Sequence, residues 1–144
     1  MVIKMNKYQK LKLQHQEESD TFGWKFANTE IRFIKMMNEW NLASDDIDKI
    51  YYLGNACFIL AVDKPAYFAM KERHKKEHQQ AIAQDATGNG YIYQMFAYEL
   101  ETHSFEFLHR LDIVLDTLDL TLEQINSNAK LKRGLTKALK KYES

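Results

Sequence analysis

Two β-prone runs on either side of a Gly-Asn pair constrain the fold of this chain most. The first run covers Ile50 to Leu53, the second covers Cys57 to Val62, and Gly54-Asn55 lies between them. Glycine and asparagine tolerate the positive φ angles that a tight turn between antiparallel strands requires. The sequence therefore predicts a β-hairpin near its middle, and this prediction argues against an all-helical fold.

Helical periodicity dominates the rest of the chain. Asp63-Lys64-Pro65 predicts the start of a long helix that continues to about Gln84, because Asp can cap free amides and Pro is tolerated in the first turn. Apolar residues at helical spacing predict further helices, including one from about Tyr91 to His103 and one from about Phe107 to Leu118. We expect a helix-dominated α+β fold, in which a small antiparallel sheet of two to three strands, with one hairpin, packs with five to six helices.

The length and composition favour one domain over residues 1–144. Hydrophobic residues make up 45% of the 144 residues, and no linker rich in Pro and Gly interrupts them. Residues 1–20 are the exception, because from about Asn6 to Glu18 the only large apolar groups are Tyr8, Leu11 and Leu13, in a segment rich in Lys and Gln. This weak amphipathicity predicts a peripheral N-terminal helix.

The overall charge excludes partners that are recruited by net charge alone. Lys plus Arg and Asp plus Glu number 20 each, so the chain offers no net field to nucleic acid or to an anionic membrane. The N-terminus also lacks the sustained apolar stretch of a signal peptide or a membrane span. We expect a cytoplasmic protein with no membrane partner.

Charge is nevertheless distributed unevenly along the sequence. Residues 101–123 hold six acidic residues against Arg110, whereas the C-terminal helix is basic. Solvated helix faces are commonly charged, but such segregation also suits a contact surface for a macromolecular partner. The candidate partner-binding residues form two basic clusters: Lys71, Arg73, Lys75 and Lys76, and then Lys130, Lys132, Arg133, Lys137, Lys140 and Lys141.

The segment His74-Lys75-Lys76-Glu77-His78 matches an H-x-x-E-H pattern, which places two imidazoles one helical turn apart. Such a pair can chelate a metal, and Glu99 or His103 on the next helix could supply a third ligand. The competing interpretation is that these histidines are satisfied by ordinary hydrogen bonds. The candidate polar cluster or metal site comprises His74, Glu77, His78, Glu99 and His103, with zinc as the metal considered.

A second candidate site lies in the segment Thr87-Gly88-Asn89-Gly90, directly before a predicted helix. Free amides and the helix dipole at such a position can hold an anion, so Thr87, Gly88 and Gly90 are candidate ligands. The segment is not a P-loop, because the Lys-Ser/Thr pair is missing. It can equally serve as a helix stop and a tight connection.

A set of residues from about Phe26 onward carries a family resemblance. It comprises Asp48-Lys49-Ile50, Phe58-Ile59, Phe68, Met70, Arg73-His74, Glu77, Asp85, Thr87-Gly88, Gly90, Ile92, Met95-Phe96, Tyr98-Glu99-Leu100, His103 and Leu118 to Thr121. On these residues the chain resembles an uncharacterised family of small proteins from Gram-positive bacteria and their phages or mobile elements. The family pattern carries no known activity, and His78 and the stretch Gly54-Asn55-Ala56-Cys57 depart from it. The resemblance therefore implies a context and no mechanism.

Three functional hypotheses follow. The first is a non-enzymatic binding or inhibitory protein of a phage or mobile element that needs no cofactor, acts on a host protein or nucleoprotein, and in its sharpest form antagonises a defence nuclease as anti-CRISPR proteins do. The alternative is a small metal- or phosphate-dependent enzyme centred on His74, Glu77, Glu99 and His103. The third is a homodimer with Tyr91, Tyr93 and Tyr98 in its interface. Contact with nucleic acid through the basic patches is left open.

Overall fold

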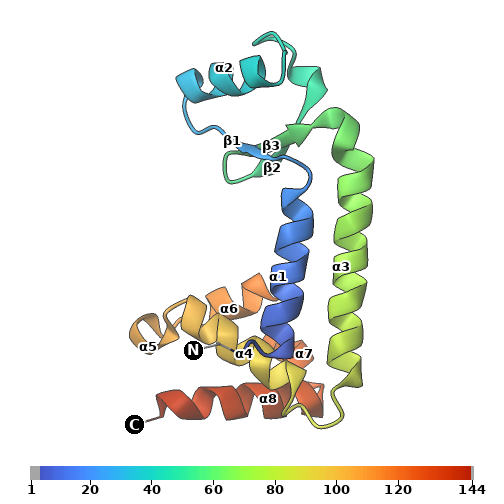
Figure 1. The fold of residues 1–144 in the computed structure, drawn as a ribbon. Helices are drawn as coiled ribbons and strands as arrows, with labels where there is room; N and C mark the ends of the chain where they lie inside the picture. The colour runs from blue at the N-terminus through green and yellow to red at the C-terminus, as the bar shows by residue number, and fades with distance from the viewer. Residues whose placement is uncertain (1–3, 144) are drawn as a thin grey trace. The chain divides into compact units, whose positions relative to one another are not determined.

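The computed structural model describes residues 4–143, and helices dominate it beside a small antiparallel sheet (Figure 1). This architecture confirms a helix-dominated α+β fold. The helices are α1 (Lys7–Asp20), α2 (Glu30–Glu39), α3 (Lys64–Gln84), α4 (Tyr91–Thr102), α5 (Phe105–Leu108), α6 (Leu111–Thr117), α7 (Leu122–Asn126) and α8 (Ala129–Leu139). The strands are β1 (Lys25–Phe26), β2 (Ile50–Gly54) and β3 (Cys57–Leu60), and 3-10 turns cover Ile47–Lys49, Ala61–Asp63 and Lys140–Tyr142.

The chain divides into two compact units. Unit 1 contains the residues up to Leu13 and those from Lys76 onward, and unit 2 contains Gln14–Lys75. Helices α1 and α3 therefore contribute residues to both units. One domain over residues 1–144 stays a prediction, because compact units can still unfold together as one cooperative domain.

The predicted hairpin forms the sheet of unit 2. Strand β3 lies in the middle, with antiparallel β2 on one side and the two-residue β1 on the other. Asn55 and Ala56 have φ angles of 52° and 61°, so both turn residues adopt the left-handed conformation that tight hairpins need. Helix α2, whose first turn is capped by the Thr29 side chain, buries Met36 and Met37.

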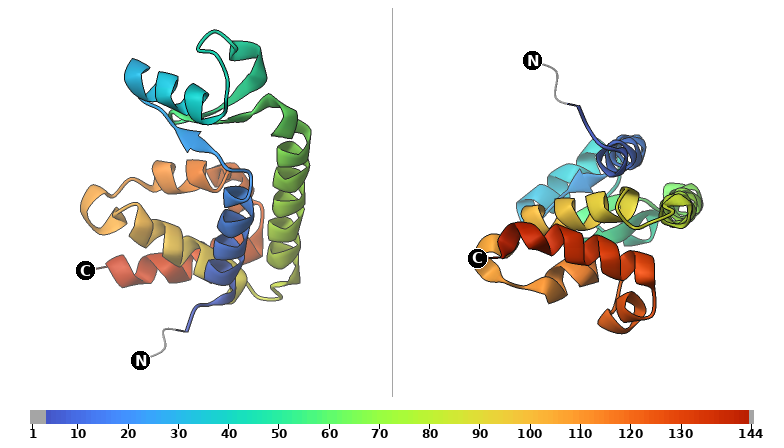
Figure 2. Two further views of the ribbon diagram at one scale, coloured as in Figure 1. Left: turned by 45° about the horizontal axis from the view of Figure 1, so that its top comes forward. Right: turned by 90° about the horizontal axis from the view of Figure 1, so that it is seen from below.

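Unit 1 contains the larger core. Helices α4 and α8 lie side by side (Figure 2), and α4 buries Ile92, Met95, Phe96 and Leu100 at helical spacing. Tyr8 from the first turn of α1 is also buried in this core, with 6% of its surface exposed. The first turn of the N-terminal helix is thus anchored by an aromatic ring, although its sequence is weakly amphipathic.

One predicted helix is divided in two. The apolar spacing from Phe107 to Leu118 predicts a single helix, but the chain ends α5 at Leu108 and begins α6 at Leu111. His109 between them has a φ of 50° and donates its N–H to the Phe105 carbonyl, which closes α5. Leu108 is consequently 58% exposed, whereas Leu115 is buried as predicted.

The approach of α8 to α4 depends on the lack of a side chain at Gly134. A Cβ atom there would lie 2.5 Å from Cγ2 of Ile92 and 2.7 Å from the carbonyl oxygen of Gly88. A Cβ atom at Gly88, whose φ is 93°, would likewise clash with the backbone of Lys130. The two glycines bring the loop between α3 and α4 into direct contact with α8. Within residues 4–143, no helix is both long enough and apolar enough to cross a membrane.

Candidate functional site

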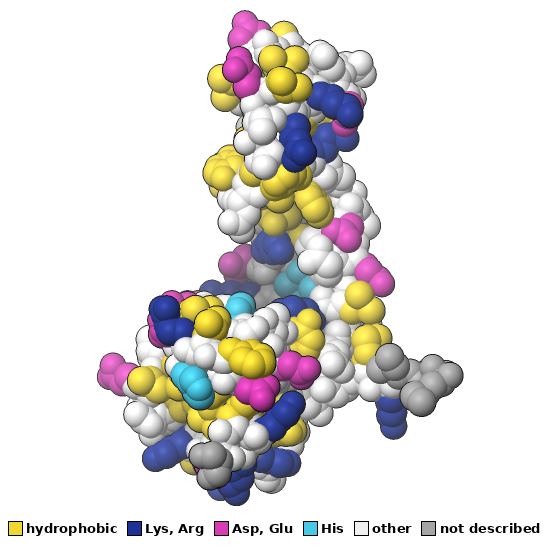
Figure 3. All heavy atoms as spheres, turned by 90° about the vertical axis from the view of Figure 1, so that its left-hand side faces the viewer, with side chains coloured by type: hydrophobic (Ala, Val, Ile, Leu, Met, Phe, Trp, Pro, Cys, Tyr) yellow, Lys and Arg dark blue, Asp and Glu magenta, His cyan; other side chains and the backbone are white. Residues whose placement is uncertain are grey.

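A basic pocket lies along the exposed face of α8 in unit 1. Its volume is about 480 Å³, and apart from Asn89 every residue that lines it comes from α8 or the turn that follows. The buried face of α8 carries Leu131, Leu135 and Ala138, so the amphipathic pattern of the helix turns its cations outward. Figure 3 shows Lys and Arg side chains along the lower part of unit 1. The pocket is lined by Asn89, Ala129, Lys132, Arg133, Thr136, Lys137 and Lys140.

Two cations of this pocket are held in place by neighbouring groups. Arg133 donates from Nη1 to the Thr87 carbonyl oxygen at 2.7 Å, and the ammonium of Lys137 lies 4.5 Å from the centroid of the Tyr93 ring. Lys132 on α8 and Lys140 at the start of the turn that follows are both exposed and lie eight residues apart. Four positive charges therefore surround one pocket, and two of them, on Arg133 and Lys137, are held in place by contacts with neighbouring residues.

The loop between α3 and α4 is organised by the carboxylate of Asp85. Its Oδ1 accepts hydrogen bonds from the amides of Thr87 and Gly88, and its Oδ2 accepts from those of Gly90 and Ile92. Desolvation raises the pKa of Asp85, but the four amide donors together outweigh it and hold the pKa below its ordinary value. The amides of Thr87, Gly88 and Gly90, which the sequence marks as anion ligands, thus bind an anion that belongs to the chain.

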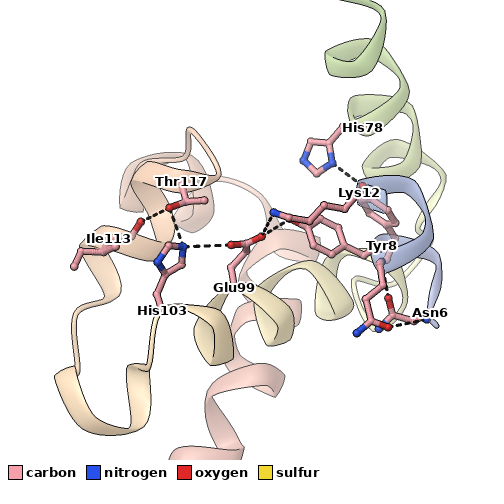
Figure 4. Close-up of polar contacts among 10 residues, drawn as sticks. Asn6, Tyr8, Lys12, His78, Glu99, His103, Ile113 and Thr117 are labelled. Atoms are coloured by element: carbon pink, nitrogen blue, oxygen red, sulfur yellow. Dashed lines mark hydrogen bonds and ion pairs between the residues drawn. The ribbon is translucent and has the colours of Figure 1, made fainter. Parts of the chain in front are cut away.

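A buried carboxylate, Glu99, forms the centre of the polar cluster in unit 1 (Figure 4). Only 1% of Glu99 is exposed. Its Oε1 accepts a hydrogen bond of 2.7 Å from the Tyr8 hydroxyl and one of 2.8 Å from Nζ of Lys12. Burial, followed by the hydrogen bond to Glu99, raises the pKa of Tyr8 well above its ordinary value, so this phenol stays a proton donor.

His103 approaches the same carboxylate from the end of α4. Its Nε2 lies 3.4 Å from Oε2 of Glu99 and 3.1 Å from Oγ1 of Thr117. The Thr117 hydroxyl already donates to the carbonyl oxygen of Ile113, so it must accept at His103. This assigns a proton to Nε2 of His103, which points toward the carboxylate as a donor (Figure 4).

The negative charge of Glu99 is buried and neutralised by its neighbours. Three donors surround Glu99, and its negative charge is balanced by the half-exposed ammonium of Lys12. A metal ion at Oε1 of Glu99 would have to displace the Tyr8 or Lys12 contact. Nδ1 of His78 is hydrogen bonded to the Tyr91 hydroxyl at 2.6 Å, and the His78 ring lies edge-on to that of Tyr8.

In unit 2, His74 is the centre of a second polar group. It is 6% exposed, and its Nε2 lies 2.8 Å from Oε1 of Glu18. The other oxygen of Glu18 binds the guanidinium of Arg73, and these two partners, Arg73 first, lower the pKa of Glu18 to about 2. The ring of His15 stacks on that of His74 with a centroid distance of 3.8 Å and an interplanar angle of 10°.

The structure thus separates the predicted metal ligands into different contacts. Glu99 and His103 meet, His78 binds Tyr91, and His74 binds Glu18 and stacks on His15. Glu77 is half-buried one turn after His74 on α3. The basic cluster of α3 has partners of its own, because Lys71 reaches Ser19 and the Tyr67 ring, Arg73 binds Glu18, and Lys75 and Lys76 are exposed.

The tyrosines expected at a dimer interface are not freely exposed. Tyr91 is 5% exposed, and Tyr93 and Tyr98 pack against the core of unit 1. The apolar side chains that are exposed lie mainly elsewhere, in unit 2, where Figure 3 shows hydrophobic patches. They include Trp24, Phe26, Ile31, Tyr52, Val62 and Phe68.

Comparison with known proteins identifies a family and no activity. Residues 7–141 match DUF7659, which is described as a family of unknown function. No curated protein and no solved structure matches the chain.

Proposed function

The chain belongs to DUF7659, a family of unknown function that matches it over residues 7–141, so we propose a function from its surface chemistry. We propose that it is a non-enzymatic protein that binds the nucleic-acid backbone of a host nucleoprotein. The observation that carries this proposal is the basic pocket of α8. Lys132, Arg133, Lys137 and Lys140 surround it without an acidic residue in the lining.

The spacing of these cations suits a row of phosphates. Lys132 and Lys140 are eight residues apart, which is about 12 Å along a helix. A strand of duplex DNA carries one phosphate per about 3.4 Å of axis, so the pocket spans several phosphates. The chain has zero net charge, and local contacts of this kind must therefore supply the attraction.

The sharpest form of this proposal is an antagonist of a defence nuclease, encoded by a phage or mobile element. A small binding protein that occupies the nucleic acid held by a nuclease blocks it without any catalytic group of its own. Support comes from the segregated charge and from the resemblance of the sequence to proteins of mobile elements. Cleavage by candidate CRISPR effectors, measured with and without the purified protein, tests this form directly.

Binding itself is tested by fluorescence anisotropy with labelled single-stranded and duplex DNA over a series of salt concentrations. The logarithm of the affinity is expected to fall linearly with the logarithm of salt, and Lys132→Gln or Lys140→Gln should each reduce that slope by about 1. Lys35→Gln on α2 is the matched control and should leave the slope unchanged. Binding to polyglutamate in place of DNA would instead assign the pocket to an acidic protein.

A second candidate function, a metal- or phosphate-dependent enzyme centred on His74, Glu77, Glu99 and His103, is favoured by one observation. Glu99 and His103 are close enough for a shared ion between them, at 3.4 Å. Tyr8 and Lys12, however, already occupy the other oxygen of Glu99. A metal that is retained by wild-type protein and lost from both Glu99→Gln and His103→Gln would favour the enzyme over the binding protein.

A further inference from the structure

The C-terminal half of α1 and the N-terminal half of α3 pack antiparallel to each other within unit 2. Phe22 packs edge-on against Tyr67, Ser19 accepts a hydrogen bond from Lys71, and His15 stacks on His74. His15 and Ser19 lie on α1 and Phe22 follows its last residue, Asp20, and the three are spaced at i, i+4 and i+7, the spacing of one helix face. The packing of the two helices thereby brings together two histidine rings, one from each helix.

The protonation of His74 follows from its partner. The carboxylate of Glu18 contacts both the Arg73 guanidinium and the His74 ring, and an ionised carboxylate can only accept hydrogen bonds. Nε2 of His74 therefore carries the proton in the 2.8 Å contact with Oε1 of Glu18. In the neutral imidazole this leaves the lone pair on Nδ1, so the ring is fixed in one tautomer.

The stacked arrangement also brings ring nitrogens of the two histidines close together. A neutral imidazole is the form that coordinates a metal ion. One ring nitrogen of His15 and one of His74 lie within 4.8 Å of each other.

We propose that His15 and His74 bind a divalent transition-metal ion of the Zn²⁺ class, with Glu18 as the carboxylate that orients His74. A histidine that ligates zinc commonly donates its second ring N–H to a carboxylate, which is the contact between His74 and Glu18. Zinc binds imidazole nitrogen at about 2.0–2.1 Å, so tetrahedral ligands lie about 3.4 Å apart. Because the lone pair of an imidazole nitrogen lies in the ring plane, the two stacked rings reach one ion only when His15 turns out of the stack toward the His74 nitrogen.

This site is independent of the α8 pocket and differs from the cluster that the sequence predicts. It takes only His74 from that cluster, and it adds His15 and Glu18, which the H-x-x-E-H pattern does not contain. Two protein nitrogens leave further coordination positions for water or for a group of a partner. The role that fits such a site is to fasten α1 to α3 in unit 2.

The test is a Zn²⁺ titration of untagged, chelator-treated protein against a chromophoric chelator, with Co²⁺ absorption as a second readout. Wild-type protein should take up one equivalent. His15→Phe, which keeps an aromatic ring on His74 but has no ligating nitrogen, should abolish uptake. Glu18→Gln should weaken binding about 10- to 100-fold.

The matched control is His109→Asn, because His109 is exposed and its φ of 50° is tolerated by asparagine. This variant should bind like the wild type, and circular dichroism should show that all variants are folded. Absence of stoichiometric uptake by wild-type protein, or uptake that persists in His15→Phe, overturns the proposal. Uptake lost from His103→Gln and kept by His15→Phe would place the metal at Glu99 instead and also overturn it.

Discussion

At the scale of single residues, Asp85 has the largest set of backbone partners of any side chain described in residues 4–143. Its carboxylate holds four amides and thereby begins α4, whose own N-cap residue, Gly90, has no side chain to do so. The sequence shows a glycine-containing break at this point, but it does not show that an aspartate upstream supplies the cap. The sequence alone therefore predicts an external anion at this loop, where the structure has the carboxylate of Asp85.

Asp85→Asn is expected to destabilise the protein by about 1 kcal/mol at pH 7, the typical value of a helix cap. The native pKa of Asp85 is lowered, so its contribution is present above the unfolded pKa and is lost as the pH falls below about 4. Urea unfolding of both proteins at pH 7 and at pH 3 measures this difference.

The difference between wild type and Asp85→Asn should shrink at pH 3. Asp45→Asn, at an exposed aspartate in unit 2, is the control and should change stability little at either pH. An effect of Asp85→Asn that is equally large at both pH values would contradict the assigned role of the charge.

At the scale of elements, close packing decides the effect of Gly134→Ala. Alanine favours helices by about 1 kcal/mol over glycine, so helix propensity alone predicts a gain in stability. A Cβ at Gly134 would instead press on Ile92 and on the Gly88 carbonyl. We expect a net loss of about 1–3 kcal/mol, typical of overpacking, in thermal or urea unfolding.

Thr136→Ala is the control for this prediction, because Thr136 lies on the exposed side of α8. It should leave stability unchanged or raise it slightly, as alanine does at exposed helix positions. A Gly134→Ala protein that is as stable as Thr136→Ala would show that α8 is not held as closely against α4 as the structure describes.

Elements were predictable where local chemistry decides them. The hairpin and the apolar stripe of α4 are present as predicted, although the two turn residues are Asn55 and Ala56, one position after the predicted Gly-Asn pair. The break at His109 was not predictable, because the spacing of apolar residues does not indicate which residue adopts a left-handed conformation. His15 was missed for a related reason: its spacing with Ser19 and Phe22 marks a helix face, but two of these three residues are polar.

At the scale of the whole molecule, the two units differ in the size of their cores. Among the described residues, thirteen buried hydrophobic residues belong to unit 1 and five to unit 2. Less buried apolar surface means a smaller free energy of opening. Native-state hydrogen exchange is therefore expected to show weaker protection for β2, β3 and α2 than for α4 and α8.

This measurement also tests the prediction of one domain over residues 1–144. Two levels of protection would mean that unit 2 opens while unit 1 stays folded. Equal protection of β3 and α4, together with a single unfolding transition, would contradict the expected difference and would favour one cooperative domain.

The uneven charge of unit 1 has a consequence for how the molecule meets a partner. Six acidic residues lie in 101–123 and the cations of α8 follow them, while the total charge is zero. A uniform field exerts no net force on such a molecule, but it exerts a torque on its electric dipole. For the proposed nucleic-acid partner, orientation of the α8 cations toward the phosphates is therefore expected to govern the rate of a productive encounter more than long-range attraction does.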